Sequence, residues 1–437
     1  MPDIYTTPTY PTYQDSENRS LYKINRLLED SFGMSSSGAS SSAFSTDAFG
    51  RLRSSDPFTL FDSSHRYADN NLWATAVATS GTSTFNAAQG LVDLAVTSAS
   101  GSEVIRETNK VFPYQPGKSL LVMNTFVMSP AKTNLRQRVG YFGAQNGYYV
   151  QLDGSTLSFV ERSFVTGSVA LNPVAQSSWN GDKLDGTGPS GLTLDITKSQ
   201  IFWMDLEWLG VGSVRLGFVI NGRFILCHTF HHSNLVASTY ITTASLPLRY
   251  EITNTGATSG SSTLKQICST VISEGGYELR GLQQAVGVPI NAARTLGGAA
   301  IQTPIVSIRL KSTRLDAIVI LTAISLMGSS SSDFNWTVTA SGTVSGGTWV
   351  DAGANSSVEY NLGGTISGGR VLASGYFNSS NQSTPSIDIL KEALFKFQLE
   401  RDSIAAVPVP YNLSLTAAGA SAGQTVFGSM DWEEVSR

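Results

Sequence analysis

Alternating apolar and polar side chains between Ile201 and His232 constrain the fold of this chain more than any other sequence feature. Apolar residues recur at every second position from 202 to 208 and again from 214 to 220. This period of two is that of a β-strand with one buried face. Asn221-Gly222 follows the second run and favours a type I′ hairpin turn, which needs positive φ at both central residues. We therefore predict a three-stranded antiparallel meander whose apolar face is covered by a second sheet.

Similar runs predict strands through most of the remaining chain. They are 118–128, 138–141, 148–152, 157–162, 249–253, 264–273, 303–310, 317–327, 335–340, 347–350, 357–362, 371–376, 412–415 and 425–432. One helix is expected near Asp388–Phe397, where apolar residues follow helical spacing. We predict an all-β protein with two β-sandwich domains of the jelly-roll or concanavalin-like type. The first covers residues 45–280, a connector covers 281–302, and a smaller sandwich with one helix covers 303–437.

Residues 1–44 have a different character. An extended arm rich in Pro, Thr and Tyr is followed by a short amphipathic helix and a Ser/Gly linker. A helix of about three turns is marginal by itself. This segment is either a floppy terminus or a docking device that orders against a neighbouring subunit, and we favour docking. The candidate docking residues are Tyr5, Tyr10, Tyr13, Leu21, Ile24 and Leu28.

The composition excludes several classes of partner. Charged residues make up 14% of the chain and the formal net charge is −4, so a sequence-independent grip on nucleic acid is not expected. No apolar run reaches the ~20 residues of a membrane span, and no secretory signal is visible. We expect a protein made in the cytoplasm, without membrane insertion, whose weakly charged faces pack against other subunits. Cys227 and Cys268 are expected to be buried free thiols.

Asp205 and Glu207 are the best enzymatic lead, because residues two apart on a strand share a face and paired carboxylates serve glycosidases. They nevertheless lie on the polar side of an amphipathic strand, where acids are expected in any case, and the third acid common in such enzymes is absent. Nucleotide-binding and nucleophile-elbow motifs are absent from the sequence as well. We predict that the chain is not an enzyme.

Three of the four histidines, His228, His231 and His232, cluster at the end of the meander. A closed zinc site usually has four nitrogen or sulfur ligands, and Cys227 is expected to point away from His228. We therefore favour a polar cluster and expect neither a metal site nor a cofactor.

Four aromatic residues are candidate sugar-stacking platforms if they lie on an exposed face. These candidate glycan contacts are Trp73, Trp179, Tyr148 and Tyr149. The alternative is ordinary packing in the core or at an interface, which we rank first.

Several stretches of the sequence carry a family resemblance. They are FGRLRSSDPFTLFD at 49–62, YQPGKS at 114–119, LDGTGPSG at 184–191, DLEWLGVG at 205–212, RYEITN at 249–254 and IRLKS at 308–312. The chain resembles uncharacterised, tail-fibre-like virion structural proteins of marine tailed phages, cyanophages among them. The resemblance spans most of residues 45–437 and implies a virion component with a lectin-like jelly-roll body. It supplies no catalytic residue.

From this resemblance we expect a structural protein of the virion, in a tail or tail-adjacent appendage that docks through its N-terminal segment. The expected partners are other virion proteins of the tail, neck or capsid, and copies of the same chain in a homo-oligomer, of which the trimer is the common form. Two alternatives stay open. One is a capsid-surface or head-decoration protein, and the other is a receptor-binding lectin that recognises a host surface glycan.

Deletion of residues 1–44 should leave a folded body that fails to join the particle, because the apolar stripe and the tyrosines of this segment are the expected docking contacts. Incorporation is measured by the amount of the truncated chain in purified particles, and folding by its thermal unfolding. Normal incorporation of the truncated chain contradicts the docking hypothesis.

Overall fold

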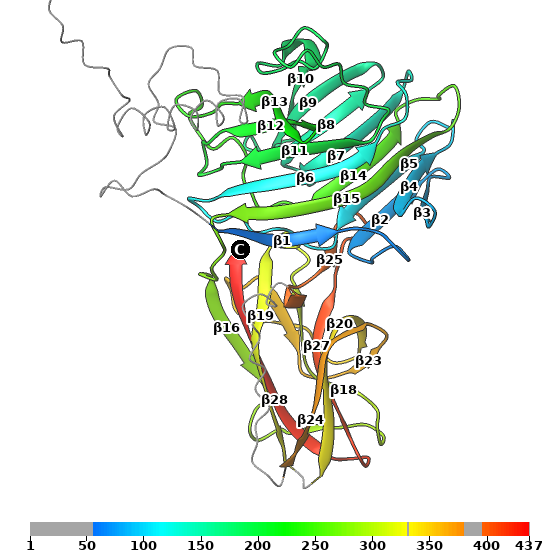
Figure 1. Cartoon of the computed structure of the whole chain (residues 1–437). Coiled ribbons are helices and arrows are strands. Elements are labelled where there is room, and N and C mark those ends of the chain that lie inside the picture. The colour runs from blue at the N-terminus through cyan, green and yellow to red at the C-terminus, as the bar shows by residue number, and fades with distance from the viewer. Residues whose placement is uncertain (1–55, 330–331, 380–395, 437) are drawn as a thin grey trace, which may run out of the picture.

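The computed structural model describes residues 56–329, 332–379 and 396–436. In these ranges the chain forms antiparallel β-sheets and a three-residue 3₁₀ helix at Gln176–Ser178. Figure 1 shows two β-sandwiches: the strands of the first run across the view, and those of the second run down from it. The predicted all-β fold with two sandwiches is confirmed. Residues 1–44 and most of the helix expected near Asp388–Phe397 lie outside the described residues.

The first sandwich consists of two large sheets. The eight-stranded sheet has the order β13 (Arg223–Phe230), β12 (Val214–Ile220), β11 (Gln200–Leu206), β6 (Ser119–Val127), β15 (Ser262–Glu274), β4 (Leu91–Val96) and β3 (Thr82–Asn86), with β1 (Pro57–Ser63) also paired to β15. The seven-stranded sheet has the order β10 (Ala170–Ala175), β9 (Thr156–Ser163), β8 (Gly147–Asp153), β7 (Leu135–Phe142), β14 (Leu248–Asn254), β5 (Glu103–Thr108) and β2 (Trp73–Ala78).

The second sandwich is smaller. Its four-stranded sheet contains β16 (Leu282–Gly287), β28 (Thr425–Ser436), β17 (Arg294–Thr295) and β19 (Ile318–Gly328). The facing sheet contains β21 (Val350–Asp351), β22 (Val358–Asn361), β18 (Thr303–Leu310), β27 (Asn412–Gly419), β20 (Asp333–Ser345), β23 (Thr365–Ser367) and β24 (Arg370–Asn378). A two-strand ribbon, β25 (Arg401–Asp402) with β26 (Val409–Pro410), completes the described elements.

The expected connector at 281–302 contains structure that the sequence did not indicate. Its strands β16 and β17 both pair with β28, so this segment is part of the second sandwich. Along β16 every residue is exposed or half-buried. An edge strand of this kind buries no continuous apolar face, and the alternation on which strand prediction depends is therefore missing.

The meander forms as predicted. β11, β12 and β13 are consecutive antiparallel neighbours, and the turn between the last two is made by Asn221 (φ 53°) and Gly222 (φ 75°). Positive φ at both positions is the type I′ geometry that Asn-Gly favours.

Aromatic packing fills the space between the two sheets of the first sandwich. Phe159 of β9 stacks on Trp179, with ring centroids 4.2 Å apart, and on Phe202 of β11 at 5.6 Å. Phe218 of β12 lies 5.7 Å from Phe202. All four rings are buried, and full burial of one such side chain contributes about 1.5–3 kcal/mol.

Both cysteines are free thiols, and Cys227 is buried as expected. Cys268, in contrast, is exposed. The register between β15 and β6 shifts between Gln266 and Ser269. This bulge interrupts the alternation at Cys268, and a bulge of that kind cannot be read from the sequence pattern.

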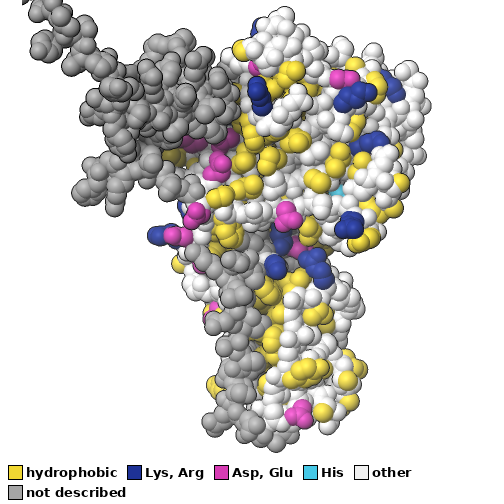
Figure 2. Space-filling view, viewed as in Figure 1, with side chains coloured by type: hydrophobic (Ala, Val, Ile, Leu, Met, Phe, Trp, Pro, Cys, Tyr) yellow, Lys and Arg dark blue, Asp and Glu magenta, His cyan; other side chains and the backbone are white. Residues whose placement is uncertain are grey.

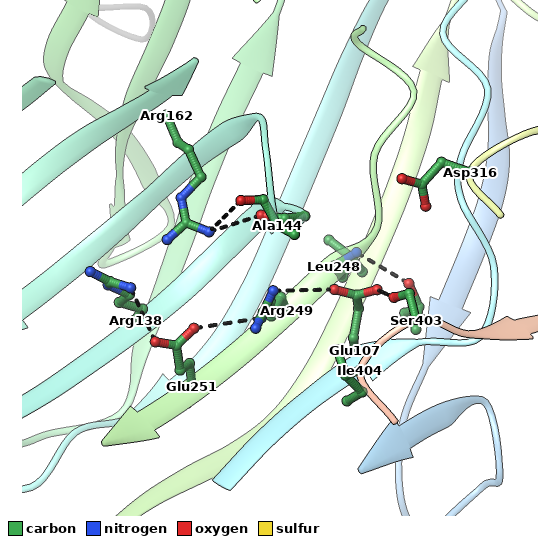
Figure 3. Close-up of polar contacts among 12 residues, drawn as sticks. Glu107, Arg138, Ala144, Arg162, Leu248, Arg249, Glu251, Asp316, Ser403 and Ile404 are labelled. Atoms are coloured by element: carbon green, nitrogen blue, oxygen red, sulfur yellow. Dashed lines mark hydrogen bonds and ion pairs between the residues drawn. The ribbon is translucent and has the colours of Figure 1, made fainter. Parts of the chain in front are cut away.

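A buried ion pair and an apolar contact join the two sandwiches. Arg401 of the β25–β26 ribbon pairs with Glu107 of β5 at 2.9 Å, and both side chains are 2% exposed. Ser403 also bonds to the Glu107 carboxylate, and Val111 packs with Ile318 and Ile320 of β19. Figure 3 shows Glu107 between Ser403 of the second sandwich and Arg249 of the first. None of the helical segments in the described ranges has the length and apolarity needed to cross a lipid bilayer.

Arg401→Ala should lower the free energy of unfolding of the full chain by about 3 kcal/mol, because it leaves Glu107 with a buried charge that has lost one partner. Denaturant unfolding followed by tryptophan fluorescence measures the change. Arg280→Ala is the matched control, since Arg280 is exposed and pairs with exposed Glu278, and it should cost less than about 0.5 kcal/mol. If Arg401→Ala and Arg280→Ala have the same free energy of unfolding, the prediction is contradicted.

Candidate functional site

A polar depression of about 610 Å³ lies at one end of the eight-stranded sheet, where β6 and β12 begin and β11 and β13 end. It is lined by Tyr114, Gly117, Lys118, Ser119, Asp205, Glu207, Leu209, Ser213, Arg215, Thr229 and His231. Four adjacent strands and two loops thus bring together hydroxyl, carboxylate and cationic groups. Figure 2 shows charged side chains scattered among many apolar and uncharged polar ones on one face of the molecule.

Asp205 and Arg215 are the central pair of this depression. They are cross-strand partners on β11 and β12 and form an ion pair. Asp205 is buried, whereas the Arg215 side chain is 57% exposed. The Oδ2 atom of Asp205 binds Arg215, and its Oδ1 atom is buried without a hydrogen-bond partner among the described residues. The exposed Arg215 guanidinium is therefore the part of this pair that a ligand can reach, and buried Asp205 holds it in place.

The loop from 207 to 213 forms one wall of the depression and is fixed at several points. Tyr114 accepts hydrogen bonds at its hydroxyl oxygen from the backbone N–H groups of Trp208 and Leu209, each at 3.2 Å. The amide of Gly212 donates to the Trp208 carbonyl at 2.7 Å. A Cβ atom at Gly212 would lie 2.3 Å from the Glu207 carbonyl oxygen, so this position requires glycine.

The acidic pair predicted from the sequence does meet in this depression, because Asp205 and Glu207 both line it. Their roles differ: Asp205 is bound by Arg215, whereas Glu207 follows the end of β11 and is exposed. Sequence reasoning missed Arg215, Lys118 and Tyr114. Arg215 could have been found, because a turn centred on Gly210 places it opposite Asp205.

The three clustered histidines go to separate places. His231 lines the depression, His228 accepts a hydrogen bond from the Asn180 amide, and His232 lies in the core. The described part of the chain contains no group of three or more His, Cys, Asp or Glu residues that could hold a metal ion.

His232 anchors the loop that walls the depression. Its Nδ1 atom donates to the Gly212 carbonyl at 2.6 Å, and its Nε2 atom lies 2.7 Å from the Glu161 carboxylate. Tyr148 donates to the same Glu161 oxygen at 2.5 Å. This buried chain of hydrogen bonds connects the seven-stranded sheet to the loop.

The four aromatic residues named as candidate sugar contacts are all buried, which agrees with the core packing that we rank first and leaves none of them on an open surface. Trp73 and Trp179 are 6% and 2% exposed, and Tyr148 and Tyr149 have no exposed surface. The indole of Trp73 packs against Phe61 and donates to Ser63. Sequence spacing cannot tell a ring that faces solvent from one that is covered. The docking candidates between Tyr5 and Leu28 lie outside the described residues.

No family model matches the sequence, and no curated protein matches it either. Three solved structures illustrate the likeness of the chain to known folds. The carbohydrate esterase vb_24B_21 from Shiga toxin-encoding bacteriophage phi24B is 12% identical, with 51% of this chain and 100% of that chain covered and a TM-score of 0.30. The Emp47p carbohydrate recognition domain is 12% identical, with 53% and 100% covered and a TM-score of 0.31.

The legume lectin-like domain from Entamoeba histolytica is 10% identical, with 50% of this chain and 97% of that chain covered and a TM-score of 0.28. Identities and TM-scores at this level carry no argument about what this chain binds or catalyses.

Proposed function

We propose that this chain is a non-enzymatic carbohydrate-binding protein whose site is the depression around Asp205 and Arg215. The observation that carries this proposal is the Arg215 guanidinium, which is more than half exposed and is held in the depression by buried Asp205, beside the exposed carboxylate of Glu207. A carboxylate accepts hydrogen bonds from sugar hydroxyls, and a guanidinium donates to sugar oxygens. Adjacent hydroxyls on a sugar ring supply both kinds of group.

The rest of the lining fits the same ligand. Ser119, Ser213 and Thr229 carry hydroxyl groups, and Leu209 offers an exposed apolar surface. Lys118 is held by Gln115 at 2.6 Å, so its charge is positioned before a ligand arrives. A few placed polar groups in a concave surface are typical of small-molecule sites.

Catalysis is disfavoured by the arrangement of the two acids. A retaining glycosidase places one carboxyl as nucleophile and the other as acid on either side of the scissile bond. Here Arg215 binds Asp205, and Glu207 lies beyond the end of its strand with its side chain in solvent. This arrangement suits hydrogen bonding to hydroxyl groups.

We also propose that the protein acts as a virion component of a tailed phage, in a tail or tail-adjacent appendage that docks through residues 1–44. The proposal rests on the sequence resemblance. Two of the resembling stretches, 114–119 and 205–212, supply most of the residues that line the depression. A head-decoration protein could carry the same site, and cryo-electron microscopy of the intact particle distinguishes the two positions.

Asp205→Ala and Arg215→Ala should each weaken glycan binding by about tenfold or more, since a hydrogen bond to a charged group contributes about 1.5–3 kcal/mol. A glycan array with the full chain identifies the ligand, and titration with that glycan gives the affinities.

Arg223→Ala is the matched control, because Arg223 is an exposed arginine at the start of β13, opposite Ile220 at the end of β12 that lies away from the depression. Asp205→Asn keeps the shape of the side chain, so it tests the loss of the charge if Asp205→Ala fails to fold. Thermal unfolding of each variant shows whether it is folded. The proposal fails if the array retains no glycan, or if the Asp205 and Arg215 variants bind as well as the control.

A further inference from the structure

The outer face of the eight-stranded sheet carries an apolar surface next to the depression. Side chains of β6, β11, β12 and β13 that face away from the core form rows across these strands. One row contains Asp205, Arg215 and Thr229 of the depression. The next two rows contain no charged residue. They are formed by Met123, Trp203, Gly217 and Leu226, and by Thr125, Ile201, Val219 and Phe224.

The larger apolar side chains of these two rows, which we call the outer strip, are Met123, Ile201, Trp203, Val219, Phe224 and Leu226. None of them belongs to the core of the first sandwich. Ile201, Phe224 and Leu226 are 39%, 54% and 40% exposed. The ring of Trp203 forms the floor of the strip, 5.5 Å from the Phe224 ring. A Cβ atom at Gly217 would lie 2.9 Å from the Trp203 Nε1 atom, so glycine lets the indole lie across β12. A continuous exposed apolar surface marks an interaction site.

The outer strip has the dimensions of a short helix. Its two rows lie about 7 Å apart along the strands, and the four strands that carry it span about 14 Å. A helix of three turns is about 16 Å long and about 10 Å wide, so it covers both rows when it crosses the strands. Residues 20–30 have this length, and their apolar residues fall on one side at helical spacing: Leu21, Ile24, Leu27 and Leu28.

The described part of the chain begins in the same sheet. Pro57, the first residue of β1, pairs with Glu274 of β15, and Glu274 pairs with Ser119 at the start of β6. Figure 1 shows β1, β15, β6, β11, β12 and β13 in order across this sheet. Three strand spacings, about 14 Å, therefore separate β1 from β11. The chain from residue 31 to residue 55 reaches about 80 Å when extended, so it spans this gap easily.

We propose that residues 20–30 form an amphipathic helix that packs its apolar side on the outer strip of the same chain. Both surfaces are apolar, and their contact removes both from water. The tether favours this segment over that of a second copy, because a flexible linker gives an effective concentration on the order of millimolar. Residues 1–19, with Tyr5, Tyr10 and Tyr13, stay available for docking to another subunit. The inference does not depend on carbohydrate binding at the depression.

Hydrogen–deuterium exchange of the full chain, read by mass spectrometry, tests the proposal. We expect slow exchange of the backbone amides of residues 20–30. Phe224→Ser combined with Leu226→Ser removes two exposed apolar contacts and should speed this exchange by about tenfold or more. Ile24→Ser, on the other side of the contact, should have the same effect. Val371→Ser is the matched control, because Val371 is an exposed apolar residue of β24 in the second sandwich, and it should leave the exchange unchanged.

The protein concentration separates a contact within one chain from a contact between copies. Slow exchange of residues 20–30 that is the same at all concentrations, and that the double variant at positions 224 and 226 removes, supports the inference. It is overturned if these residues exchange as fast as the free peptide, if the double variant keeps their slow exchange, or if dilution alone speeds it. Thermal unfolding shows whether each variant is folded. If the double variant is not, Phe224→Ala takes its place, with the same expected direction.

Discussion

Burial of the two inner sheet faces of the first sandwich is the constraint on which the rest of the structure depends. The stacked rings of Phe159, Trp179, Phe202 and Phe218 fill the space between the sheets. Because side chains alternate along every strand, a residue whose side chain faces this core has its two chain neighbours on the outer face. Asp205, between Met204 and Leu206, and Arg162, three positions after Phe159, are displayed outward for this reason.

Polar residues inside the core serve the same architecture. The chain of hydrogen bonds from Tyr148 through Glu161 to His232 and the Gly212 carbonyl crosses from one sheet to the loop beside the depression. A buried network of this kind is stable only when its members are satisfied. The network also fixes the loop beside the depression from the core side, through the hydrogen bond to the Gly212 carbonyl. The shape of the depression therefore depends on packing in the core.

The second sandwich is attached through specific contacts. The Arg401–Glu107 pair is buried, and Val111 packs with Ile318 and Ile320 of the other sandwich. Glu107 in turn contacts Arg249 of β14. The ion pair between the sandwiches is thus continuous with the charged pairs of the seven-stranded sheet, since Arg249 also lies 3.5 Å from Glu251.

The sequence by itself determined the strands with a clear period of two, the Asn221-Gly222 turn, and the common location of Asp205 and Glu207. It did not reveal the exposed edge strand β16, the bulge that exposes Cys268, or the burial of Trp73 and Tyr149. Only the tertiary structure showed that the Arg162 guanidinium lies over the Tyr149 ring, where its Nη1 atom donates to the carbonyls of Gly143 and Ala144. The physical reason is that the alternation of apolar and polar residues in the sequence indicates only which residues share a face of a strand. What covers that face, and which charges meet there, depends on pairings between segments far apart in the chain.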